Sequence, residues 1–209
     1  KLRLALLLPL SVFLFAACSS GPDDQLSKTY YTYARAVMDG RGYDAAKLAS
    51  TQTLKHYETL NDLALHGGRG MYNLSIYDEL SVYYLRAKYE AEALNKFSGR
   101  DVMNVLIKAN MVGVPDMARF TVGEIRFDSE DKAWAPLYKG DQDPVYEISF
   151  VKENGKWKID NRPMRSKRND VLLQRLMQYG GSREEVISEL LKAHGVREGL
   201  TPAVEKPLL

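Results

Sequence analysis

The stretch that decides the fold is EISFVKENGKWKID, residues 147–160. Apolar and polar side chains alternate through most of it, and the alternation is interrupted by the pair Asn154 and Gly155. An Asn-Gly pair between two alternating runs is the strongest short-range signal for a β-hairpin, because both residues tolerate the positive φ angles of a tight turn. The stretch therefore predicts two antiparallel strands joined by a two-residue turn.

The same alternation continues upstream of this hairpin. It is found in RFTVGEIRF (119–127), in KAWAPLY (132–138) and in PVYEISFVK (144–152), with turn-forming residues between them. Short alternating runs separated by turn residues are typical of a half-buried antiparallel sheet. We therefore expect a meander of about four strands from 118 to 160.

Helical periodicity precedes the meander. Ser27 is a candidate N-cap for a helix that ends before Gly40, and Tyr30, Tyr33 and Val37 recur on one face of it. Further helices are predicted at YDAAKLAS (43–50), at 53–65, at 75–97 and at 101–111, where Val and Ile leave a strand as the alternative. The expected architecture is an α+β domain over 28–160, with the N-terminal helices packed on the antiparallel meander.

The chain returns to helix after the sheet. Residues 161–196 are expected to form a basic linker followed by a C-terminal helical pair, the first helix at 170–179. Ser182 and Glu185 have capping-box spacing at the start of the second, and Gly195 is the expected stop. The segment 197–209 contains two prolines and is predicted to be a flexible tail.

The first residues have the pattern of an export signal. Lys1 and Arg3 precede an uncharged apolar run that ends in Ala16, Ala17 and Cys18. The run is too short to span a bilayer and ends in small residues, as cleavage sites do. Phe15-Ala16-Ala17-Cys18 resembles the bacterial lipoprotein signal, although Phe15 stands where leucine is usual.

That resemblance implies that residues 1–17 are removed and that Cys18 becomes a lipidated N-terminus. Residues 18–27 would then be a tether, and Ser19 is similar to the residue that sends such proteins to the outer membrane. Cys18 is the sole cysteine, so no disulfide can form within the chain. A catalytic thiol needs a folded, electropositive setting that a signal junction lacks, so ordinary secretion and an uncleaved anchor are the remaining alternatives.

Charge excludes one class of partner. The sequence has 29 basic and 27 acidic residues, and loss of Lys1 and Arg3 leaves equal numbers. A neutral chain lacks the basic footprint of a nucleic-acid binder. We therefore expect no nucleic-acid partner.

Helices followed by a meander that closes with GKWKI (155–159), together with DGRGYDAAKLAS (39–50), resemble the nuclear transport factor 2-like, or cystatin-like, superfamily. In such proteins a curved sheet wraps around N-terminal helices as a cone. The resemblance implies an alternative function, binding or isomerase- or cyclase-like conversion of a small ligand by an Asp base and Tyr donors in that cone.

The sequence itself nominates no catalytic residue, cofactor or metal site. The candidate tyrosines, Tyr30, Tyr33, Tyr57, Tyr83 and Tyr84, are expected to pack with their hydroxyls at the surface. The histidines, His56, His66 and His194, are not at metal-ligand spacing. Asp141 and Asp143 could suggest a divalent cation, but two carboxylates are too few and suit a turn. Enzymatic activity is left open, with binding favoured.

The sharpest surface feature is NRPMRSKRND, residues 161–170. Its cations Arg162, Arg165, Lys167 and Arg168 are candidate contacts for an anion or an acidic partner, and a solvated linker is the alternative. We therefore expect a lipid-anchored protein on the periplasmic side of the outer membrane that serves as a binding or assembly module of an envelope complex. Its helices at 75–111 and 170–194 would be the docking surfaces.

Overall fold

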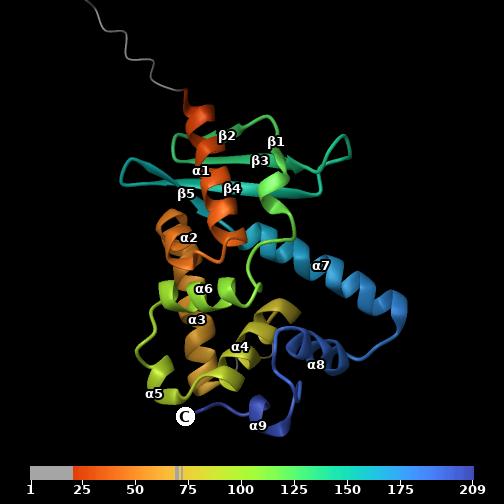
Figure 1. Ribbon diagram of the computed structural model, residues 1–209. Helices are drawn as coiled ribbons and strands as arrows, with labels where there is room; N and C mark the ends of the chain where they lie inside the picture. Colours follow the sequence, from red (N-terminus) through yellow and green to blue (C-terminus); the bar gives the residue numbers. More distant parts are fainter. Residues whose placement is uncertain (1–20, 69–70, 72) are drawn as a thin grey trace, which may run out of the picture.

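The computed structural model describes residues 21–68, 71 and 73–209. The predicted signal and Cys18 lie outside these residues. The helices are α1 (Pro22–Met38), α2 (Gly42–Leu48), α3 (Thr51–His66), α4 (Ile76–Lys88), α5 (Ala91–Leu94), α6 (Gly99–Lys108), α7 (Arg162–Tyr179), α8 (Arg183–Ala193) and α9 (Pro202–Glu205). Figure 1 shows α1 crossing the sheet, with most other helices gathered beyond one side of it.

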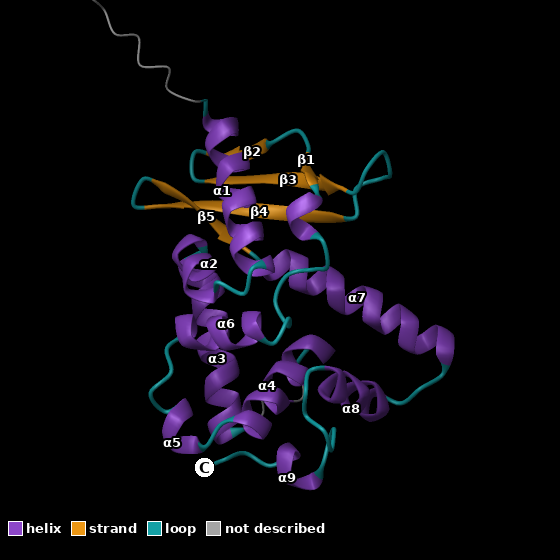
Figure 2. Cartoon of the chain, in the orientation of Figure 1, coloured by secondary structure: helices purple, strands orange, loops and turns teal. Residues whose placement is uncertain are grey.

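The sheet is antiparallel throughout. Its strands are β1 (Thr121–Val122), β2 (Arg126–Ser129), β3 (Lys132–Tyr138), β4 (Tyr146–Glu153) and β5 (Lys156–Asp160), in the order β1-β3-β4-β5, with β2 also paired to β3. Asn154 and Gly155 have φ angles of 51° and 74°, as a tight turn with positive φ at both central residues requires. The predicted α+β class and the hairpin are confirmed (Figure 2).

One core joins α1 to the sheet. The helix buries Leu26, Tyr30, Tyr33 and Val37. The sheet contributes Ala133, Ala135, Leu137, Ile148, Phe150 and Ile159, each at most 2% exposed. Alternation along β3 and β4 directs these side chains to one face. Side chains therefore occupy the space between α1 and the sheet.

A second part of the core lies among the helices, where two glycines allow close packing. A Cβ atom at Gly99 would lie 2.2 Å from the Leu54 carbonyl oxygen, and one at Gly42 would lie 2.4 Å from Cα of Asn104. Any larger residue at these positions would separate α6 from α3 or from α2. The described residues contain no helix with both the length and the hydropathy of a membrane span.

The start of α1 differs from the prediction. The helix begins at Pro22, so residues 22–27 of the predicted tether are helical and Ser27 is not the N-cap. Proline suits the first helical turn, because its missing N–H would have no partner there. Asp23 and Asp24 in the same turn complement the positive end of the helix dipole.

The single helix predicted over 75–97 is also wrong. The chain leaves α4 at Tyr89, which has extended backbone angles, and α5 is a separate short helix. Tyr89 instead packs edge-on against Phe97, with ring centroids 5.2 Å apart. The helix predicted at 101–111 is confirmed over 101–108 as part of α6, which begins with a capping box formed by Ser98 and Asp101 and ends at Lys108.

The predicted linker and tail both contain helical residues. α7 runs without interruption from Arg162, with Pro163 in its first turn, so there is no linker before position 170. The helix predicted from Ser182 is confirmed as α8. The tail contains α9, and the backbone N–H of Leu209 donates to the Leu65 carbonyl at 2.8 Å. The segment 197–209 thus contains a short helix and a backbone hydrogen bond to α3, and its flexibility stays a prediction.

Candidate functional site

A polar pocket of about 270 Å³ lies where the N-terminal ends of α4 and α7 meet α3. Its lining consists of polar or charged side chains: His56, Asn73, Ser75, Asp78, Arg162, Arg165, Ser166 and Asn169. Groups able to donate, accept or carry charge converge here from three helices. It is therefore the candidate site for recognition of a polar ligand.

Asp78 is the centre of this site. Its Oδ1 accepts a hydrogen bond from Arg165 of α7 and lies 3.0 Å from Nε2 of His56 of α3. Ser75, the N-cap of α4, accepts from the Asp78 backbone N–H at 3.1 Å. The side chain of Asn169 in α7 accepts a hydrogen bond from the backbone N–H of Ile76, the first residue of α4, at 2.8 Å. These hydrogen bonds hold the first turn of α4 in place, and with it the carboxylate of Asp78.

Charge pairing decides what Asp78 can do. Burial by itself would raise the pKa of this carboxyl, but the hydrogen bond from His56 and the charge of Arg165 outweigh it and hold the pKa well below its usual range. For Arg165, burial opposes the charge while Tyr57 and Asp78 favour it, so its pKa is raised. Asp78 is therefore a permanent anion at neutral pH and a weak base.

Three of the predicted tyrosines are fully buried. Tyr30, Tyr33 and Tyr57 are at most 1% exposed, so the predicted packing role is correct, but their hydroxyls are inside the protein. Nδ2 of Asn161 donates to the hydroxyls of Tyr33 and Tyr57, each at 3.1 Å, and the Tyr30 hydroxyl donates to a backbone carbonyl. Burial raises the pKa of Tyr30 and Tyr33 above the ordinary range.

Two buried atoms next to this network have no partner within the described residues: Oδ1 of Asn161 and Nε of Arg165. A buried unsatisfied polar atom destabilises the fold by about 1–3 kcal/mol. The remaining tyrosines of the predicted set are more peripheral. Tyr83 donates to Glu79 at 3.0 Å, and Tyr84 is half-buried.

The four predicted cations do not share one set of contacts. Arg162 donates to both oxygens of Asp160, at 2.8 and 2.6 Å. Arg168 lies 4.1 Å from the Tyr77 ring centroid and also donates to the hydroxyl of that residue at 3.0 Å. Lys167 is exposed and forms no ion pair with any described residue.

The structure thus brings Arg162 and Arg165 to one pocket and directs Arg168 elsewhere. Both pocket arginines already have a carboxylate partner. Their role as anion or partner contacts stays a prediction.

The histidines lie apart from one another. His66 is exposed, 3.8 Å from Asp62, whereas Nδ1 of His194 lies 2.8 Å from a backbone carbonyl. Asp141 and Asp143 are exposed in the loop between β3 and β4. Within the described part of the chain, no three His, Cys, Asp or Glu side chains are arranged to hold a metal ion.

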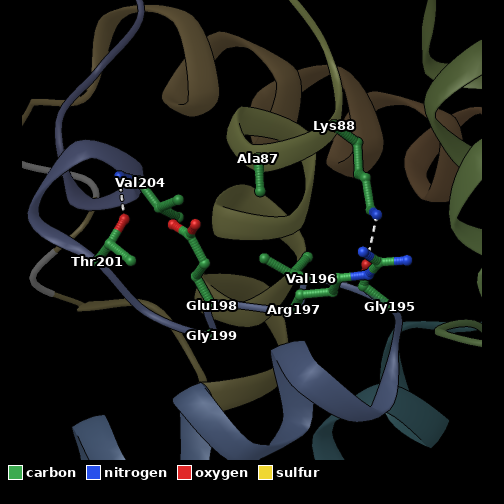
Figure 3. Close-up of a pocket in the computed structure, with 9 residues that line it drawn as sticks. All are labelled: Ala87, Lys88, Gly195, Val196, Arg197, Glu198, Gly199, Thr201 and Val204. Atoms are coloured by element: carbon green, nitrogen blue, oxygen red, sulfur yellow. Dashed lines mark hydrogen bonds between the residues drawn. The ribbon is translucent and has the colours of Figure 1, made fainter.

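Figure 3 shows a different pocket, of about 360 Å³, between the end of α4 and the segment 195–204. Lys88 already donates to the Gly195 carbonyl at 2.6 Å. Glu198 and Arg197 point toward opposite ends of the pocket (Figure 3). Because its charged groups do not converge, this pocket is a weaker candidate than the one around Asp78.

Fold and site together define an α+β protein with a curled antiparallel sheet, a filled core and an ion-paired polar pocket. No protein-family model, curated protein or solved structure matches the chain. The resemblances to lipoprotein signals and to the nuclear transport factor 2-like superfamily therefore stay predictions.

Proposed function

We propose that the chain is a lipid-anchored protein of the cell envelope, on the periplasmic side of the outer membrane, that acts by binding a partner protein. The anchor rests on the sequence around Cys18. Only Ser19, Ser20 and Gly21 separate this residue from α1. Four extended residues span at most about 14 Å, so a lipid at Cys18 would hold the start of α1 next to the headgroups.

The observation that carries the binding role is the apolar surface of α7. Met177 is 76% exposed and Val171 is 36% exposed. Leu172, Leu173 and Leu176 are half-buried and pack against the core, so the exposed apolar surface of α7 is formed mainly by Val171 and Met177. Exposed apolar residues that gather on one helix are typical of a protein-protein contact. We assign the C-terminal half of α7 to the partner interface.

The polar pocket favours binding over catalysis. Asp78 is held in an ion pair with Arg165, and the carboxylate of Asp160 is held by Arg162. Neither carboxylate has the raised pKa of a general acid or base. The cone-cavity alternative gains no support, because α1 and the sheet bury their side chains against each other.

The anchor is tested by metabolic labelling of cells with a palmitate analogue. The wild-type chain should carry the label and fractionate with outer membranes, whereas Cys18→Ala should carry none. Absence of label from both forms contradicts the anchor.

The interface is tested by placing a photo-crosslinking amino acid at Met177 in intact cells. A discrete crosslinked protein should appear there but not from Lys108, an exposed control position on α6. The same crosslinked species from both positions, or from neither, contradicts the assignment of α7.

A further inference from the structure

A groove separate from α7 lies between the β4-β5 hairpin and the starts of α3 and α6. It consists of two adjoining hollows of about 510 and 370 Å³, which share Thr51, Leu54 and Arg100. The hairpin closes one side with Glu153 and Lys156. Because the two hollows share residues, a ligand larger than a single ion could contact both.

Its lining is strongly cationic, although the chain as a whole is nearly neutral. The cations are Lys47, Lys55, Arg100, Lys156 and Lys158, against the two carboxylates of Glu58 and Glu153. Lys55, Arg100 and Lys156 form no ion pair with any described residue. Lys47 pairs with Asp44, but both side chains are substantially exposed, where such pairs contribute little.

The placement of these charges is unfavourable for the isolated domain. Arg100 lies in the first turn of α6, where a cation opposes the helix dipole, although Asp101 in the same turn complements it. α3 has no acidic residue in its own first turn. Instead, Glu153 of the hairpin places a carboxylate at the start of α3. It accepts hydrogen bonds from the Thr51 backbone N–H at 2.8 Å and from the Thr51 hydroxyl at 2.9 Å.

We infer that this groove binds an acidic peptide segment of a partner protein. Glu153 belongs to another element, and its carboxylate is already bound at the start of α3. The groove therefore accommodates the chemical group that an acidic peptide would bring. Leu54, Ala46 and Ala49 provide an apolar wall for the methylene groups of Glu side chains. An acidic segment would neutralise the unpaired cations along the groove.

The position of the groove favours a peptide over a lipid surface. In Figure 1, α1 begins beside β2, at the opposite side of the sheet from α2, α3 and α6. The first turn of α1 contains Asp23 and Asp24, and residues 126–132, which form β2, the turn after it and the first residue of β3, contain Asp128, Glu130 and Asp131 against Arg126 and Lys132. If the proposed anchor is present, this end lies nearest the bilayer, and α2, α3 and α6, which line the groove, lie farther from it.

The test is fluorescence anisotropy with the full chain in a non-ionic detergent and a fluorescein-labelled peptide of eight glutamates flanked by glycines. Removing two groove cations, Arg100→Gln with Lys156→Gln, should weaken binding about fivefold or more. The matched control, Lys108→Gln with Lys132→Gln, removes two exposed cations outside the groove and should leave binding unchanged. Thermal unfolding checks that both double variants are folded.

The direction in which a third variant changes the affinity for the peptide is decisive. Glu153→Gln removes a carboxylate that competes with the ligand, so it should tighten peptide binding about threefold, while Ser50 remains the N-cap of α3. The inference is overturned by no binding at low salt, by equal losses in the two double variants, or by unchanged or weaker binding to Glu153→Gln. It is also overturned if phosphatidylglycerol vesicles or polyphosphate bind in place of the peptide. Cys18→Ala should bind the peptide normally, which separates this result from the test of the anchor.

Discussion

Arg165 and Asp78, which are 87 positions apart in the sequence, form an ion pair that joins α7 to α4. Their side chains are only 8% and 16% exposed. Nε2 of His56 lies 3.0 Å from the same carboxylate oxygen, Oδ1 of Asp78. One partly buried anion thus connects three helices, and the start of the C-terminal helical region depends on it.

Asp78→Ala should strongly destabilise the protein, because it leaves the buried guanidinium of Arg165 without its counter-ion. Breaking a buried ion pair by removing one partner costs about 3–5 kcal/mol. Asp78→Ala combined with Arg165→Met should cost less than Asp78→Ala alone, since no unpaired charge remains. Urea unfolding of the wild type, Asp78→Ala, Arg165→Met and the double variant provides the measurement, and additive losses would contradict the pairing.

A surface pair serves as the control. Glu92 and Lys96 also form an ion pair, at 2.8 Å, but their side chains are 86% and 71% exposed. Glu92→Ala should change the free energy of unfolding by at most about 1 kcal/mol. A loss as large as that of Asp78→Ala would show that burial is not the cause of the difference.

The carboxylate of Asp78 should also make the free energy of unfolding depend on pH. The pKa of Asp78 is lowered from its ordinary value of 3.8, so the folded state binds this proton less tightly than the unfolded state. The resulting stabilisation is complete above about pH 5 and is lost as the pH falls through the folded-state pKa. The urea midpoint of the wild type should therefore fall more steeply below pH 4 than that of Asp78→Asn. Parallel curves would contradict this prediction.

Local sequence signals predicted much of the fold, where the cause of a structure was itself local. The Asn154-Gly155 turn, the alternation along β4 and the capping box at Ser182 all act over a few residues, and each is confirmed. The prediction of helix boundaries failed where packing between side chains, rather than the local sequence pattern, determines where a helix ends. The helical pattern over 75–97 continues through Tyr89, but packing of Tyr89 on Phe97 accompanies a break there.

The candidate site could be predicted only in part. The basic segment indicated Arg162 and Arg165, but nothing near them identifies Asp78 or His56 as neighbours, because the contacts arise from the docking of α7 on α4 and α3. The same holds for the tyrosines. Their helical spacing predicted burial, yet only the position of Asn161 at the end of β5 explains where the hydroxyls of Tyr33 and Tyr57 bond.

Arg86 should be essential for holding the C-terminal segment. Its guanidinium donates to the Leu63 and Ala64 carbonyls at the end of α3, and to the carbonyl of Glu205 in α9. Arg86→Met should therefore release residues 202–209 while most of the fold persists. Limited proteolysis should cleave that segment faster in the variant than in the wild type. Lys88→Met, which removes one exposed contact to Gly195, should have a smaller effect, and equal cleavage rates would contradict the role of Arg86.

Gly99→Ala tests the close packing of α6 on α3. The added methyl group would lie 2.2 Å from the Leu54 carbonyl oxygen and 2.9 Å from its carbonyl carbon, and a backbone carbonyl cannot rotate away as a side chain can. Although alanine favours helix, this overlap should lower the free energy of unfolding by about 1–3 kcal/mol. Gly181→Ala is the matched control, because its methyl group would meet no atom nearer than 3.6 Å. Thermal unfolding should show a clear loss for Gly99→Ala alone, and the same variant should weaken acidic-peptide binding because it displaces Arg100 from the groove.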